Sequence, residues 1–173
     1  SEIEKIRYID KPVVAAVNGV AAGAGASIAI CCDIVVATKS ASFIQAFSKI
    51  GLVPDSAGTF FLPRLVGMQK ATALMMTAES VSAKDAEEMG MIYKVFPDDK
   101  FVEESWKLVS KLAKMPTKGL GLTKQLLNAS YSNNLEQQLE MEDKCQTIAG
   151  NSSDFKEGVN AFLEKRKANF KGE

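Results

Sequence analysis

VNGVAAGAGASIAICCDIVVA, residues 17–37, decides the fold, because it places three glycines and several alanines between two apolar stretches. The run VVAAV at residues 13–17 is typical of a short strand buried on both faces. The segment after Gly23 predicts a buried helix, and IVVA after Asp33 predicts a second strand. The sequence therefore predicts a strand, a helix and a strand in succession, as in an α/β core.

The small residues at positions 19–26 permit a turn with positive φ and a close approach to the main chain. A helix that begins there directs its first N–H groups outward, without partners in the helix. Such donors suit an anion, or an oxygen that becomes anionic during a reaction. Tight packing of the helix on the sheet is the alternative explanation. The stretch lacks both the acidic residue of the dinucleotide fingerprint and the lysine of a phosphate-binding loop.

The composition restricts the chemistry. The chain has 173 residues, with 21 basic and 21 acidic side chains and no histidine. Because the charges balance, we expect neither nucleic acid nor a membrane surface as a partner. Without histidine, the chain cannot form Ser–His or Cys–His nucleophile pairs or histidine-ligated metal sites. Proton transfer must use a carboxylate, Lys, Tyr, Cys or water.

Two further features bear on location. Residues 1–12 lack the charged, apolar and small-residue regions of a signal peptide. The three cysteines are odd in number, and the adjacent Cys31 and Cys32 are poorly placed to pair with each other. We therefore expect a reduced, cytoplasmic setting, with both residues as small members of the core.

The remainder of the chain is mostly helical in pattern. SASFI at residues 40–44 predicts a third short strand. The segment that follows, up to Thr59, contains Gly51, Pro54 and Gly58, which are typical of a loop. Long helical patterns follow, at residues 99–114, 117–130, 135–149 and 153–168. We expect an α/β core over residues 1–98 and a helical region over residues 99–173. Two or three short strands do not make a complete parallel sheet, so the chain is expected to be part of a larger domain.

An acidic residue, Asp55, lies in the segment GLVPDSAGT at residues 51–59, among apolar side chains. If those neighbours exclude water from Asp55, its charged form is disfavoured, which would suit proton exchange near neutral pH. The alternative is that Asp55 caps the helix expected near Thr59 or shapes the turn before it.

Together these stretches resemble a known family. The run from KPVVAAVNGVAAGAGAS through AFSKIGLVPDSAGT, with VSAKDAEEMGMI and the terminal EGVNAFLEKRKANF, is similar to the enoyl-CoA hydratase/isomerase, or crotonase, superfamily. The resemblance covers essentially the whole chain. It implies a crotonase-like α/β fold, a ββα spiral, followed by a helical region for trimerisation and closure of the acyl pocket. Roughly the first third of the family's domain has no counterpart here.

The resemblance assigns roles to the glycine-rich turn. Members of the family bind an acyl-CoA thioester and hold its oxygen with two backbone N–H groups, which stabilises an enolate. One of these donors falls on Ala24, between Gly23 and Gly25, which are expected to contact the substrate. The other donor belongs to the part of the fold without a counterpart here. No cofactor is implied, since the coenzyme A thioester is itself the substrate.

The resemblance also indicates which carboxylate residue transfers protons. Hydratases of the family use two glutamates, and the matching positions here are Ser27 and Phe47. Asp55 matches the position where several isomerase-like members carry a lone acid. We therefore expect an isomerase in which Asp55 shifts a proton on the enolate, with Phe47 against the substrate. An apolar wall is expected to exclude water, formed by Ile44, Phe47, Phe60 and Leu62.

Among the branches of the family, the sequence is most similar to those of the phenylacetate-pathway isomerases that act on ring-1,2-epoxyphenylacetyl-CoA. Enoyl-CoA isomerases are near neighbours. Two alternatives stay open. One is enoyl-CoA hydration or another crotonase-type reaction, and the other is a binding module without turnover.

Three later residues have two interpretations each. Phe162 matches an aromatic residue that closes the acyl pocket, or it is plain core. Lys165 matches a position that contacts the CoA phosphate, or it belongs to a solvated basic face. Arg64 is expected to orient a turn or a carboxylate in a structural role, or it takes part in catalysis. The apolar positions of the late helices predict contacts between subunits, in a homotrimer or a pair of trimers.

Overall fold

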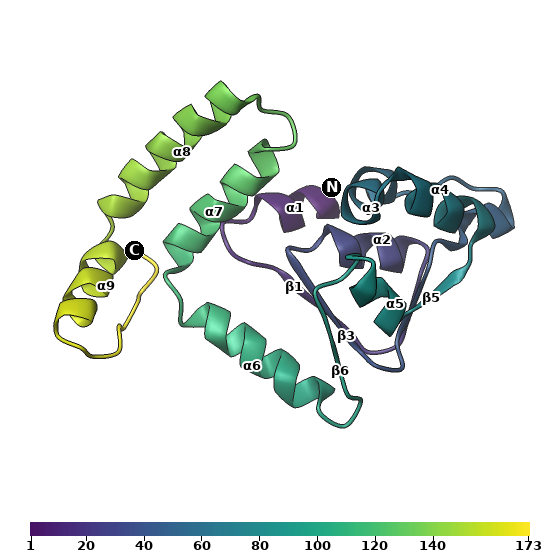
Figure 1. Cartoon of the computed structure of the whole chain (residues 1–173), viewed down its shortest axis with the longest axis horizontal. Helices are drawn as coiled ribbons and strands as arrows, with labels where there is room; N and C mark the ends of the chain where they lie inside the picture. The colour runs from purple at the N-terminus through teal and green to yellow at the C-terminus, as the bar shows by residue number, and fades with distance from the viewer. The chain divides into compact units, whose positions relative to one another are not determined.

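The computed structural model describes residues 1–173. The chain divides into two compact units, one formed by residues 1–7 with 13–107 and the other by residues 8–12 with 108–173. The first unit contains all the strands, and the second contains the helices that follow residue 107, including the last part of the helix at residues 101–113 (Figure 1).

Two three-stranded sheets form the first unit. Their strands are β1 (Val14–Val17), β2 (Val20–Ala22), β3 (Ile34–Thr38), β4 (Ser42–Ile44), β5 (Ser80–Ser82) and β6 (Lys94–Phe96). One sheet has the order β1-β3-β6 and is parallel throughout. The other has the order β2-β4-β5, in which β2 and β4 are parallel and β5 is antiparallel. Because β1 to β4 alternate between the sheets, the chain winds as a spiral of two layers.

The strand at residues 13–17 was expected to be buried on both faces, and this expectation is wrong. β1 is an edge strand of its sheet in this chain, and its residues are half-buried or exposed. The fully covered strand is β3, which has a neighbour on each side and in which Val36 and Ala37 have no exposed surface. Burial of this kind requires neighbours on both edges, which only the central strand has.

Helices cover these strands and form the second unit. In the first unit they are α1 (Glu2–Tyr8), α2 (Ala24–Cys31), the 3₁₀ helix η1 (Ala46–Ile50), α3 (Gly58–Val66), α4 (Met68–Thr77) and α5 (Ala83–Glu88). The chain continues with α6 (Phe101–Ala113), α7 (Thr117–Ala129), α8 (Leu135–Gly150) and α9 (Ser153–Leu163). None of these helices combines the length and the apolar composition that crossing a membrane requires.

Most of the expected elements are confirmed, namely the strands within residues 13–17, 34–37 and 40–44, the helix after Gly23 and the four late helices. β2, β5 and β6 were not expected. The last two lie in a stretch whose sequence pattern is mostly helical. Each of the three has only three residues, which is too short for a period of two to stand out.

α2 is the central helix of the first unit. Its buried residues are Ala26, Ser27, Ala29, Ile30 and Cys31. Because side chains on several of its faces are buried, α2 lies inside the core between the strands and α3 (Figure 1). Cys31 is buried, as expected of a core residue, whereas Cys32 is only half-buried.

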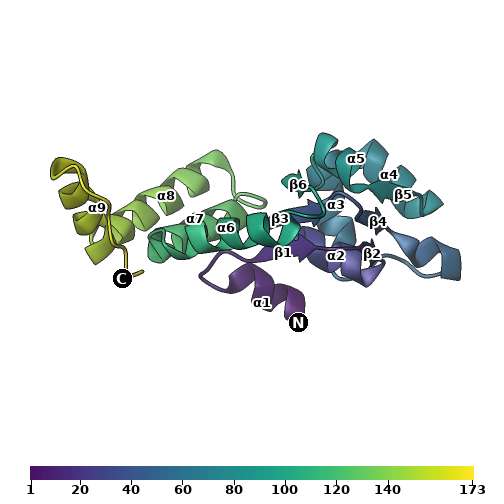
Figure 2. The ribbon, with the colours of Figure 1, turned by 90° about the horizontal axis from the view of Figure 1, so that it is seen from below.

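In the second unit, α7 and α8 lie side by side in both views (Figures 1 and 2). The segment before β1 packs on α7, where the Lys124 ammonium donates to the Lys11 carbonyl at 3.0 Å. The C-terminal tail returns to the start of α9. There the buried Asp154 carboxylate accepts hydrogen bonds from the N–H groups of Lys171 and Gly172, at 2.7 and 2.8 Å.

Candidate active site

The turn that begins α2 fixes a backbone donor. Gly23 is the N-cap of α2, with φ +54° and ψ −123°, a backbone conformation that residues other than glycine rarely adopt. The Gly23 N–H donates to the Ile44 carbonyl on β4, at 2.8 Å. The next N–H, that of Ala24, lies in the first turn of the helix, where no carbonyl of the helix can accept it. The geometry therefore leaves the Ala24 N–H available to an oxygen outside the chain.

Phe47 packs directly on this turn. It lies in η1 and is buried, and its ring is 3.7 Å from the place where a Cβ on Gly23 would lie. The side chain thus supports the backbone of the turn, and it has no group that exchanges protons.

Ser27 is one turn further along α2 and has no exposed surface. Its hydroxyl donates to the Gln45 side-chain oxygen at 3.5 Å. It also lies against Gly58, where an added Cβ would be 2.5 Å from the Ser27 Oγ. A side chain enclosed in this way cannot activate a water molecule for attack.

Asp55 begins a tight turn. The Gly58 N–H donates to the Asp55 carbonyl at 2.9 Å, and the two residues between them, Ser56 and Ala57, have φ of 49° and 61°. Positive φ at both central positions is the pattern of a type I′ turn, which usually contains glycine or asparagine. Side chains such as those of serine and alanine are strained in this region.

The capping interpretation of Asp55 is wrong. α3 begins at Gly58, its N-cap is Ala57, and no side chain forms a cap hydrogen bond there. The expectation that apolar neighbours shield Asp55 is also wrong, because the residue is exposed. Two of those neighbours, Leu52 and Val53, are themselves exposed, at 58% and 81%.

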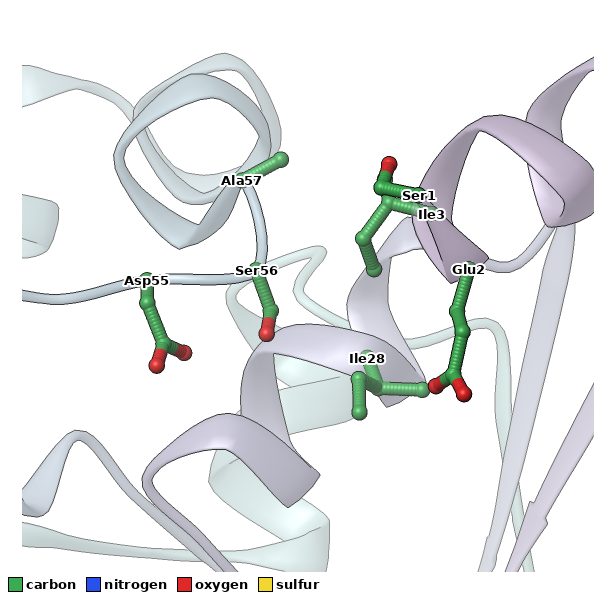
Figure 3. Close-up of a pocket in the computed structure, with 7 residues that line it drawn as sticks. All are labelled: Ser1, Glu2, Ile3, Ile28, Asp55, Ser56 and Ala57. Atoms are coloured by element: carbon green, nitrogen blue, oxygen red, sulfur yellow. The ribbon is translucent and has the colours of Figure 1, made fainter.

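Asp55 instead faces an open cavity of about 490 Å³. The lining residues are Ser1, Glu2, Ile3, Ile28, Asp55, Ser56 and Ala57 (Figure 3). Three elements meet here, namely the start of α1, the outer face of α2 and the turn before α3. In the view of Figure 3, Ile28 lies between the carboxylates of Asp55 and Glu2.

The cavity and the glycine turn share a face of α2. Ala24 precedes Ile28 by four residues, so the two occupy the same side of the helix one turn apart. Ser27 lies beside them and contacts Gly58, at the end of the turn that carries Asp55. The Asp55 turn thus packs on α2 through Gly58, and Ile28 of the same helix lines the cavity that Asp55 faces.

The expected apolar wall does not line this cavity. Leu62 has no exposed surface and belongs to the core cluster, and Phe60 is 40% exposed. Ile44 lines a separate small cavity together with Gln45. The apolar side chains that do line the cavity are those of Ile3, Ile28 and Ala57.

Two arginines have structural contacts. Arg64 donates to the Phe60 carbonyl at 2.8 Å and lies over the Phe60 ring, 3.8 Å from its centroid, so it stabilises the first turns of α3. Arg7 donates to the Cys31 carbonyl at 2.9 Å and to the Asp33 carboxylate at 3.1 Å. The contact between Arg7 and Asp33 was not predicted, because no pattern in the sequence links these two positions.

Phe162 and Lys165 lie in the second unit, at the end of α9. Phe162 is 83% exposed, so its interpretation as plain core is wrong. Lys165 is exposed and has φ +53°. Their roles in closing the acyl pocket and contacting CoA stay predictions.

Comparison with known proteins identifies the family of the chain. The sequence profile of the enoyl-CoA hydratase/isomerase family matches residues 1–173. The chain is 46% identical over 170 residues to the 1,2-epoxyphenylacetyl-CoA isomerase of Escherichia coli, covering 98% of this chain and 65% of that protein. It is 47% identical over 162 residues to a probable enoyl-CoA hydratase of Rhodobacter capsulatus, covering 93% of this chain and 63% of that protein. The chain therefore spans a little under two thirds of the length of these relatives.

Solved structures agree on the fold. An enoyl-CoA hydratase from a Polaromonas species superposes with a TM-score of 0.93 at 37% identity, over 98% of this chain and 66% of that one. A putative enoyl-CoA hydratase from Streptomyces coelicolor gives a TM-score of 0.95 at 34% identity, over 99% of this chain and 62% of that one. The expected crotonase-like α/β fold is confirmed, and the chain belongs to the enoyl-CoA hydratase/isomerase family.

Proposed function

We propose that the protein containing this chain is an acyl-CoA isomerase that moves a carbon–carbon double bond with a single carboxylate. The observation that carries the proposal is that Asp55 and Ile28 of α2 line one cavity, while the Asp55 turn lies against Ser27 of the same helix through Gly58. At the two positions where the family resemblance places hydratase glutamates, the chain has the enclosed Ser27 and the buried Phe47. Neither can exchange a proton with a substrate as a carboxylate does.

The proposed reaction begins with the thioester oxygen near the Ala24 N–H. Asp55 removes a proton from the carbon next to the thioester carbonyl, and the electron pair moves onto the thioester oxygen to give a dienolate. The protonated Asp55 then returns the proton to the far end of the conjugated system, which shifts the double bond by one position. A backbone donor at the developing oxyanion typically lowers such a barrier by about 3 kcal/mol.

The cavity lining is consistent with proton transfer. Ile3, Ile28 and Ala57 supply an apolar surface beside Asp55, which disfavours a water molecule there when an acyl group is bound. A single acid on one face of the dienolate suffices for removal and return of the proton, and no cofactor is needed.

The substrate class follows from the family and the relatives. We assign an acyl-CoA thioester as substrate, with Gly23 and Gly25 against the thioester and Lys165 at the CoA phosphate. The 1,2-epoxyphenylacetyl-CoA isomerase relative is named for an acyl group that carries a ring epoxide, which supports that branch as the first to test. Phe162 is assigned to closure of the acyl pocket.

A second candidate is enoyl-CoA hydration. The observation in its favour is that Glu2 lines the same cavity as Asp55, so two carboxylates face one space. Addition of water across a double bond needs one group to activate the water and one to protonate the carbon, which such a pair could supply. A hydratase relative of similar identity also supports it.

Assembly into a homotrimer or a pair of trimers is part of the proposal. The helices α8 and α9 expose large apolar side chains: Leu135, Leu139, Ile148, Phe155, Val159, Phe162 and Leu163. A soluble monomer rarely leaves so many exposed on two neighbouring helices. Sedimentation of the full-length protein should show three or six copies, and a monodisperse monomer would rule this part out.

The two candidates differ in their preferred substrate. The full-length protein would be offered a 3-enoyl-CoA and, separately, a 2-enoyl-CoA, and the ultraviolet absorbance of the conjugated thioester followed. An isomerase raises the absorbance of the first mixture, whereas a hydratase lowers that of the second. The variant Glu2→Gln should keep isomerase activity. Rapid hydration that is lost in Glu2→Gln would establish the second candidate instead.

A further inference from the structure

The contact between α2 and the start of α3 is unusually close. A Cβ added to Gly58 would lie 2.5 Å from the Ser27 Oγ, 3.4 Å from the Ser27 Cβ and 3.6 Å from the Gln45 side-chain oxygen. Gly58 itself does not have a positive φ. Glycine is therefore required here by the neighbouring hydroxyl group and not by the backbone conformation.

This contact lies next to the strained turn. The Gly58 N–H donates to the Asp55 carbonyl, which closes the turn through Ser56 and Ala57. Two successive residues with positive φ are retained only where the surrounding structure holds them. Of the two ends of the turn, Asp55 is exposed and Gly58 is buried against Ser27. The buried end is thus the one that fixes where the turn lies.

The other side of the contact is fixed as well. Ser27 has no exposed surface, its N–H donates to the Gly23 carbonyl at 3.1 Å, and its hydroxyl reaches Gln45. Ser27 is therefore tied to the glycine turn of α2, three residues after Ala24. A rigid path of three links connects Ala24 to Ser27, Ser27 to Gly58, and Gly58 to Asp55.

From this path we infer that Ser27 and Gly58 are positioning residues, whose contact sets the distance between the Asp55 carboxylate and the Ala24 N–H. The inference rests on the proposed function, in which these two groups act on the same substrate. Ser27 and Gly58 touch no substrate atom. They act by holding the Asp55 carboxylate at the distance from α2 at which it reaches the carbon to be deprotonated.

The variant Gly58→Ala tests this directly. Its methyl group cannot fit beside the Ser27 Oγ in its present position. Because Ser27 is fully buried and its hydroxyl is hydrogen-bonded to Gln45, we expect the start of α3 and the Asp55 turn to move away from α2. A misplacement of about 1 Å costs on the order of 100-fold in rate. We expect kcat of the full-length protein to fall by about that factor, with KM nearly unchanged because CoA contacts are not altered.

The double variant Ser27→Ala, Gly58→Ala makes the test specific. With the hydroxyl removed, the nearest remaining atom is the residue 27 Cβ, at 3.4 Å from the new methyl group. Most of the lost kcat should return, because the clash that moves the turn is removed. Gly119→Ala is the matched control, since Gly119 lies inside α7 and a Cβ there meets nothing within 4 Å. Its kcat should equal that of the parent protein.

Crystal structures of the parent and Gly58→Ala proteins separate this inference from the proposed function. The inference predicts that residues 55–57 move away from α2 in Gly58→Ala and return in the double variant. If the parent protein does not isomerise a 3-enoyl-CoA, the proposed function fails and the structures still decide the positioning. An unmoved turn, an unchanged kcat in Gly58→Ala, or equal kcat in the single and double variants would overturn the inference.

Discussion

Two turns of this protein both require positive φ, and they obtain it differently. At the start of α2 the residue is Gly23, which adopts φ +54° without steric cost. Before α3 the residues are Ser56 and Ala57, which adopt similar values at a cost. The first turn presents a backbone N–H, and the second presents the Asp55 carboxylate. The donor is therefore built into a relaxed backbone, and the acid into a strained one held by packing.

The largest effect is expected when the relaxed turn is strained. In Gly23→Ala, the new methyl group has room, since the nearest atom is 3.7 Å away on the Phe47 ring, so any cost comes from the backbone. We expect the free energy of unfolding to fall by about 2 kcal/mol. Activity on a 3-enoyl-CoA should fall by about 100-fold as the Ala24 N–H turns away.

Chemical denaturation and steady-state kinetics would measure the two effects of Gly23→Ala. Gly119→Ala serves as the control for the change of residue type. Unchanged stability together with unchanged turnover would mean that the turn does not depend on glycine.

A smaller effect is expected when the strained turn is relaxed. Ala57→Gly removes the side chain that resists a φ of 61°. The free energy of unfolding should rise by about 1 kcal/mol, since the left-handed conformation costs alanine roughly that much. Because glycine also widens the range of conformations, kcat should fall several-fold while KM stays the same. A variant that is less stable than the parent would contradict the assignment of strain to this turn.

The smallest effect concerns a third segment, the C-terminal tail, which is held by charge. Arg166 donates to both Glu157 carboxylate oxygens at 2.7 and 2.9 Å, and the Asn169 N–H donates to the same group at 2.8 Å. The hydrogen bonds from Arg166, and then that from Asn169, lower the pKa of Glu157 from 4.5 to about 2.

A lowered carboxyl pKa stabilises the tail fully above pH 4.5, and this stabilisation is lost as the pH falls towards 2. Amide exchange at Asn169, corrected for its intrinsic pH dependence, should therefore accelerate over that interval. The variant Glu157→Gln should show fast exchange already at neutral pH. If the corrected amide exchange rate at Asn169 does not change with pH in the parent protein, Glu157 does not hold the tail. The turn at Gly23, which no titratable side chain holds, should remain protected.

The conformation of the first of the two turns was predictable from sequence, and that of the second was not. Glycines before an apolar run indicate a tight start to a helix, and Gly23 is where the structure has it. A turn before the helix near Thr59 was expected, but serine and alanine disfavour positive φ, so nothing local indicated that conformation at Ser56 and Ala57. Its cause is a contact between Ser27 and Gly58, which are 31 positions apart, and one sequence does not reveal such a contact.

The site was predictable to a similar degree. Its parts, Ala24 and Asp55, were named from residue types and a family resemblance, and whether they act together stays a prediction. The apolar wall was misassigned, because Leu62 belongs to the core and Ile3, from a helix 25 residues before Ile28, takes part in the lining. An apolar residue in a sequence shows that it avoids water, and only the fold shows which cavity or core it joins.

The role of Asp55 is tested by comparing the full-length protein with its Asp55→Asn variant. Both would be offered a 3-enoyl-CoA, with formation of the conjugated product followed by ultraviolet absorbance and binding of CoA thioester measured separately by calorimetry. The proposed role of Asp55 predicts that Asp55→Asn binds the thioester as the parent does and loses turnover by at least about 100-fold, as expected when a general acid–base group is removed. Equal turnover in the two proteins would contradict it.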